Sequence, residues 1–189
     1  MNRRDALSRV ALLLGGTVVG AEAFLKGCKT ETKYGASLNF KPEDVAYLNE
    51  VAETILPRTN TPGAKDAKVG EFMTVIVKDC YEEDDQKTFL DGMQKLNDAS
   101  QTKNKKSFME STPEQRHALL VDLDKEAKDY QKNRKEKDPN HYFSLMKQLT
   151  LWGFFTSKEG ATQALRYVAV PGRYEGCIPY KKGDKAWAT

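Results

Sequence analysis

Apolar residues recur at intervals of three and four along most of the chain, which is the spacing of amphipathic helices. The pattern predicts a first helix that begins at Pro42 and ends at Pro57, since proline cannot continue a helix. A turn-rich loop follows, and a second helix is expected over residues 67–80. The acidic run 82–85 favours the start of a third helix, because the helix dipole stabilises negative charge there.

Three further segments follow the same spacing. Thr112, Pro113 and Gln115 form the pattern of a capping box and predict a helix to about residue 131. Residues 142–155 are apolar around most of the helical circumference, which indicates the centre of a bundle or a helix covered by another surface. A short helix is expected over 157–166, and an ordered but irregular Gly/Pro-rich tail over 168–189. Because no stretch alternates as a strand would, we expect one all-α domain of five or six helices over residues 42–189.

The first 27 residues have a different character. Arg3 and Arg4 precede an apolar run from Val10 to Ala21, which is too short and too rich in glycine to cross a bilayer comfortably. This arrangement is typical of a twin-arginine export signal, which serves proteins that fold before export. We therefore expect a periplasmic location. Residues 28–41 are polar without a period and are predicted to form a tether.

Two cleavage sites remain open at the end of this segment. Leu25-Lys26-Gly27-Cys28 is similar to a bacterial lipobox, in which the cysteine is acylated, although lysine is unusual at its position. The rival is Ala21-Glu22-Ala23, a site for ordinary signal peptidase. We favour acylation of Cys28, and two or more acyl chains would hold the protein stably on a membrane.

Charge and cysteine content narrow the possible partners. The chain has a formal net charge of +3, and the four basic and two acidic residues ahead of Cys28 leave the mature chain near +1. We expect no nucleic-acid partner, because a near-neutral chain has no general attraction to it. The basic runs 103–106 and 132–137 are interpreted as solvated faces. With Cys28 lipidated, Cys80 and Cys177 are expected to form a disulfide, the alternative being two buried thiols.

Motifs for chemistry are missing from the sequence. His117 and His141 are the two histidines, and both are interpreted as ordinary surface or boundary residues. There is no C-x-x-C pair, no C-x-x-C-H haem site, no Gly-rich nucleotide loop and no G-x-S-x-G motif. The carboxylates within 122–126 do not share one helix face. We therefore expect no catalytic, cofactor-binding or metal site in this chain.

Four segments carry a family resemblance: residues 2–7, the stretch Glu53-Thr54-Ile55-Leu56-Pro57-Arg58-Thr59-Asn60-Thr61-Pro62-Gly63-Ala64, residues 151–166, and the glycine-rich tail 171–177. With these segments the chain resembles the small, third subunit of membrane-associated gluconate 2-dehydrogenase-type flavoprotein complexes, in a lipoprotein-like form. Asn60 stands where the family usually has aspartate, which matters only if that aspartate caps the next helix.

The resemblance implies a partner rather than a catalyst. The large subunit of such complexes looks like a GMC-type flavoprotein that binds FAD and oxidises a sugar, sugar acid or glycoside, and a cytochrome c with haem usually takes the electrons. The flavoprotein often lacks an export signal, so the small subunit would carry the signal for both.

For that partner we expect a contact surface that combines exposed aromatic residues with arginine. It would consist of Trp152, Phe154 and Phe155 on the apolar helix, and of Arg173 and Tyr174 in the tail 171–179. The alternative is that the aromatic residues fill this domain's own core. Two other functions stay open: a stand-alone envelope lipoprotein that acts as scaffold or binding module, and an enzyme with an unrecognised site.

Overall fold

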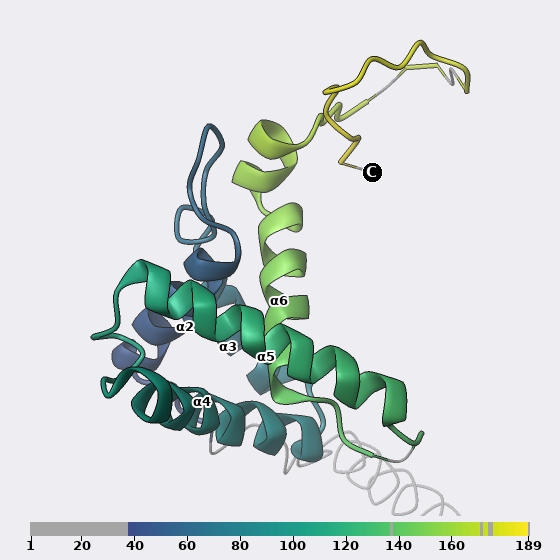
Figure 1. Cartoon of the computed structure of the whole chain (residues 1–189). Coiled ribbons are helices and arrows are strands. Elements are labelled where there is room, and N and C mark those ends of the chain that lie inside the picture. Colours follow the sequence, from purple (N-terminus) through teal and green to yellow (C-terminus); the bar gives the residue numbers. More distant parts are fainter. Residues whose placement is uncertain (1–37, 137, 171, 174–175, 189) are drawn as a thin grey trace, which may run out of the picture. The chain divides into compact units, whose positions relative to one another are not determined.

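The computed structural model describes residues 38–136, 138–170, 172–173 and 176–188. Within them the chain forms α2 (Pro42–Ile55), α3 (Val69–Cys80), α4 (Glu83–Asn104), α5 (Pro113–Asn133), α6 (Tyr142–Thr156) and the π-helix η1 (Gly160–Ala164) (Figure 1). In these residues the only strand-like pairing is one parallel bridge near the C-terminal end. The expected all-α fold is therefore confirmed. Arg3, Arg4 and Cys28, which carry the export and lipidation predictions, lie outside the described residues.

Helix boundaries follow from local chemistry. The Asp44 carboxylate accepts a hydrogen bond from the Lys41 backbone N–H at 2.8 Å and so caps the start of α2. At the start of α5, Thr112 Oγ1 accepts from the Gln115 N–H at 3.3 Å, and Gln115 Oε1 accepts from the Thr112 N–H at 3.0 Å. This reciprocal pair is the capping box that the sequence predicts.

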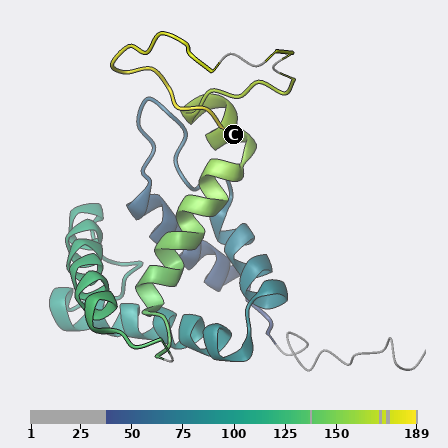
Figure 2. The same ribbon diagram turned by 90° about the vertical axis from the view of Figure 1, so that its right-hand side faces the viewer.

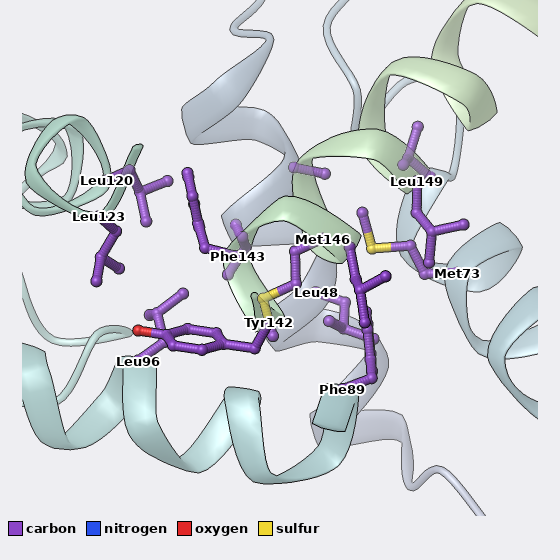
Figure 3. Packing of buried hydrophobic residues seen from close by; sticks show 14 of the residues in the cluster. Leu48, Met73, Phe89, Leu96, Leu120, Leu123, Tyr142, Phe143, Met146 and Leu149 are labelled. Atoms are coloured by element: carbon purple, nitrogen blue, oxygen red, sulfur yellow. The ribbon is translucent and has the colours of Figure 1, made fainter. Parts of the chain in front are cut away.

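Helix α6 is the centre of the domain, because it packs against α2, α3, α4 and α5 (Figure 2). Its inward face is buried and consists of Tyr142, Phe143, Leu145, Met146, Leu149, Thr150, Gly153 and Phe154. Figure 3 shows Phe143 directed toward Leu120 and Leu123 of α5, and Leu149 close to Met73 of α3. The expectation of a central helix is confirmed for this face.

Helix α4 approaches the start of α6 closely because residue 92 is glycine. A Cβ atom at Gly92 would clash with the Cβ and ring atoms of Tyr142. The Tyr142 ring lies along α4 beside Leu96 (Figure 3). Burial, and secondarily the negative charge of Glu126, raises the pKa of the Tyr142 hydroxyl to about 12.

The loop between α2 and α3 is organised by one carboxylate. Glu53 accepts hydrogen bonds from the backbone N–H groups of Arg58 and Lys65, both at 2.9 Å. Gly63 lies against this carboxylate, and a Cβ atom there would come within 2.5 Å of both oxygens. Glu53, near the end of α2, and Gly63 therefore both have a structural role in shaping this loop. Asn60 is exposed and is not the N-cap residue of α3, so the replacement of aspartate does not remove a helix cap.

Candidate partner-binding surface

The second half of α6 leaves large apolar side chains uncovered. Trp152 is 49% exposed and Phe155 is 38% exposed, and Leu151 is exposed as well. The Trp152 ring packs edge-on against Phe72 of α3, with the ring centroids 5.3 Å apart. Val75, one turn after Phe72 on the same helix face, is also exposed. We call these five residues, Phe72, Val75, Leu151, Trp152 and Phe155, the aromatic surface.

A glycine lets the two helices of this surface meet. A Cβ atom at Gly153 would lie 2.6 Å from the Phe72 ring, so the ring occupies space that any larger residue would fill. Phe72 is only partly buried, and the Trp152 ring packs edge-on against it. The Trp152 ring therefore rests against Phe72 while about half of it stays open to a partner.

Phe154 does not belong to the aromatic surface. Its side chain is 4% exposed and is part of the hydrophobic core. Two positions along a helix rotate the side-chain direction by about 200°, so Phe154 faces away from Trp152. Its ring contacts Phe155 edge-on, at 5.2 Å between centroids. The expectation that all three aromatic residues share one surface was wrong for Phe154, which fills the core as the alternative had it.

The tail folds back onto the end of η1. The Arg166 N–H donates to the Ala186 carbonyl at 2.8 Å, and the Ala188 N–H donates to the Arg166 carbonyl at 3.0 Å. The Arg166 guanidinium lies over the Trp187 ring, 3.9 Å from its centroid. These contacts close residues 167–186 into what we call the C-terminal loop. Arg173 is exposed on this loop, and Tyr174 lies outside the described residues.

The expected disulfide is not present in the structure, where Cys80 and Cys177 are both free and exposed. Cys80 ends α3 next to the start of α4, which packs near the first residues of α6. Cys177 lies in the C-terminal loop, which follows the opposite end of α6 (Figures 1 and 2). The length of α6 therefore separates the two thiols. The alternative of two buried thiols is not found either.

A partly buried ion pair joins α5 to α2 and was not predicted from the sequence. Arg116 of α5 pairs with Glu50 of α2, and Glu50 also accepts from Lys65. Arg116 donates further hydrogen bonds from Nε to the Phe108 carbonyl at 2.8 Å and from Nη2 to the Met109 carbonyl at 2.6 Å. The pair connects residues 66 positions apart, so no local pattern reveals it. Its contacts tie three segments together and give it a structural role.

The histidines occupy structural and surface positions. His141 is buried at the start of α6, where Nδ1 accepts from the Phe143 N–H at 3.3 Å and Nε2 lies 3.5 Å from Glu126 Oε1. His117 is exposed on α5. In the part of the chain that the structure describes, no group of three His, Cys, Asp or Glu side chains is placed to hold a metal ion. The same residues contain no helix both long and apolar enough to cross a membrane.

A surface groove of about 640 Å³ lies between residues 38–44 and α4. Phe40, Met93 and Met109 supply its apolar wall, and Glu43 and Asp44 lie beside them. No nucleophile paired with a base lines it.

The comparison with protein families gives one match. The family described as gluconate 2-dehydrogenase subunit 3 matches residues 42–172. This range contains every helix described above and the whole aromatic surface, and it ends within the C-terminal loop. No curated protein and no solved structure matches the chain.

Proposed function

Since this chain belongs to the gluconate 2-dehydrogenase subunit 3 family, we propose that it is the non-catalytic subunit of an FAD-dependent dehydrogenase complex. Its partner in this proposal is a GMC-type flavoprotein subunit that oxidises a sugar, sugar acid or glycoside. A cytochrome c with haem is the proposed electron acceptor. The contribution of this chain is to bind, stabilise and dock the flavoprotein.

The observation that carries the proposal is the aromatic surface within the family-matched residues. Trp152 and Phe155 stand on the most apolar helix of the domain, yet the domain leaves them half uncovered. Tryptophan and other large aromatic residues are enriched at the centres of protein interfaces, where they bury much area at low entropic cost. The Trp152 ring already packs edge-on against Phe72 before any partner arrives, which lowers the cost of ordering it on binding.

Export belongs to the same proposal and is supported by the sequence alone. Arg3 and Arg4 would direct the folded chain through the twin-arginine route together with the bound flavoprotein. Acylated Cys28 would then hold the complex on a membrane at the periplasmic side.

The test is co-purification of the tagged full-length chain from its native host in mild detergent, followed by a flavin absorbance spectrum. We expect a stoichiometric partner of flavoprotein size with a flavin band. The double variant Trp152→Ala with Phe155→Ala should weaken the binding of that partner by about 30-fold or more. Interface anchors of this kind contribute about 2 kcal/mol or more to the binding free energy.

The matched control is Leu90→Ala with Val121→Ala. Leu90 and Val121 are 37% and 38% exposed, as Phe155 is, but lie on α4 and α5. The control should retain the partner. A colourless chain that purifies alone would contradict the proposal and favour the stand-alone envelope lipoprotein.

A further inference from the structure

Charge is segregated between the helical domain and its tail. Residues 38–165 contain 19 basic and 22 acidic side chains, a net charge of −3. Residues 166–189 contain five basic and two acidic side chains, a net charge of +3. The tail is thus a locally basic element on an acidic domain, and it is attracted to anionic surfaces that the rest of the domain avoids.

Apolar side chains accompany this positive charge. Val170 is 82% exposed and Tyr180 is 77% exposed, and Ile178 is exposed beside the latter. Among the described residues, the hydrophobic core and the side chains packed against it include none beyond Ala164. The C-terminal loop therefore contributes nothing to the core and presents its apolar groups to solvent.

The loop is nevertheless held in a defined conformation. The backbone of Arg166 forms a β-bridge with Trp187 at the far end of the loop. In addition, the Lys185 ammonium donates to the Gln163 carbonyl. The Lys181 N–H donates to the Asp184 carboxylate at 2.9 Å. Gly183 closes this turn with a positive φ of 100°, which glycine adopts readily. In both views the loop continues past η1, away from α4 and α5 (Figures 1 and 2). The exposed apolar side chains of Val170, Ile178 and Tyr180 are therefore carried on a backbone that is tied at both ends.

We propose that residues 176–185 of the C-terminal loop bind the surface of a membrane that contains anionic lipid headgroups. Lys181 and Lys182 directly follow the run Ile178-Pro179-Tyr180, so apolar bodies and cationic heads are adjacent within one short segment. Such a segment suits a bilayer surface, because lysine stems and aromatic rings enter the interfacial layer while the ammonium groups stay at the anionic headgroups.

The composition favours a membrane over a protein partner. Protein interfaces are depleted of lysine and enriched in arginine and aromatic residues, and the aromatic surface contains three aromatic residues and no lysine. The segment 176–185 instead contains three lysines and no arginine. This inference does not depend on the proposed function, since a chain without a dehydrogenase partner could bind a membrane in the same way.

The test uses the full chain with a single thiol in the loop. Cys28→Ser with Cys80→Ser leaves Cys177 as the sole cysteine, which is exposed and accepts an environment-sensitive fluorophore. The labelled chain is titrated with phosphatidylcholine vesicles that contain phosphatidylglycerol, and with pure phosphatidylcholine vesicles. We expect a blue shift of the emission with the anionic vesicles only, lost at high salt.

Two matched controls locate the contact. A fluorophore on Cys80, in a chain with Cys28→Ser and Cys177→Ser, should show no shift, because Cys80 lies at the other end of α6. Lys181→Gln with Lys182→Gln should raise the lipid concentration at half-maximal shift by about 30-fold. Lys87→Gln with Lys95→Gln makes the same change of charge on α4 and should have little effect.

Three results would overturn the inference. The first is a chain that sediments with anionic vesicles while the emission of the Cys177 fluorophore is unchanged. The second is an equal loss of the shift in both pairs of lysine variants. The third is a shift that needs no vesicles and appears with the flavoprotein subunit or with increasing concentration of the chain itself.

Discussion

The two halves of α6 have similar apolar composition and opposite surroundings. In the first half, Tyr142 is covered by α4 and Phe143 by α5. In the second half, Phe72 of α3 packs edge-on against Trp152, and both Trp152 and Phe155 remain exposed to solvent. The apolar content of a helix therefore indicates how much of its surface should be buried. It does not indicate whether that surface is buried by the helix's own domain or by a partner. The exposed face of the second half, with Trp152 and Phe155, is where we propose that a second subunit binds.

The largest expected effect contrasts one phenylalanine from each half. Phe143→Ala removes a fully buried ring and should lower the free energy of unfolding by about 3–5 kcal/mol. Phe155→Ala removes a half-exposed ring and should cost about 1 kcal/mol or less. Urea unfolding followed by far-UV circular dichroism measures both. Equal losses would mean that the second half of α6 is also a core element.

Two glycines sharpen the same contrast. Gly92→Ala forces a Cβ against the Tyr142 Cβ, an atom fixed by the backbone of α6, and should cost about 1–3 kcal/mol of stability. In Gly153→Ala the three atoms nearest to the new Cβ all belong to the ring of Phe72, which is partly exposed and can rotate outward. Its cost in thermal denaturation should be smaller. A larger loss for Gly153→Ala would show that the aromatic surface is as rigid as the core.

The covered half should also make stability depend on alkaline pH. Burial raises the pKa of Tyr142 to about 12 from an unfolded value near 10, so the folded state holds this proton more tightly. The associated stability is fully present below about pH 10 and is lost as the pH rises toward 12. Tyr142→Phe should flatten this decline in chemical denaturation across that range. Tyr47, whose pKa burial also raises, contributes in the same direction and remains in the variant.

The smallest effect concerns the C-terminal loop. Trp187→Ala removes the ring beneath the Arg166 guanidinium, a contact of about 0.5–1 kcal/mol. Because the loop adds nothing to the core, the global unfolding free energy should not change. The Ala188 amide, which donates to the Arg166 carbonyl, should exchange its hydrogen faster. A lower global stability would contradict the separation of loop and core.

Local patterns predicted the elements well. Pro42, Pro113 and the Thr112–Gln115 box marked helix starts that the structure confirms, and the helix expected over 67–80 is α3 (Val69–Cys80). Each of these signals acts within a few residues, so the sequence alone contains it. The short helix expected over 157–166 is present as the π-helix Gly160–Ala164, closed by the Leu165 N–H donating to the Gly160 carbonyl.

Long-range contacts could not be predicted in this way. An all-apolar helix does not reveal which face packs inward, so the burial of Phe154 was missed. Cysteine count alone suggested a disulfide between thiols that the fold keeps at opposite ends of α6. The pair of Glu50 and Arg116 arises only once α2 and α5 are side by side.

The most direct test of the central claim measures two quantities for Trp152→Ala: its affinity for the purified flavoprotein subunit and its free energy of unfolding. The account predicts binding weakened by about 30-fold or more, with stability within about 1 kcal/mol of the parent chain. Unchanged affinity would contradict it, because Trp152 would then be an exposed residue with no partner. A parallel loss of stability and binding would contradict it as well, since Trp152 would then act through the fold.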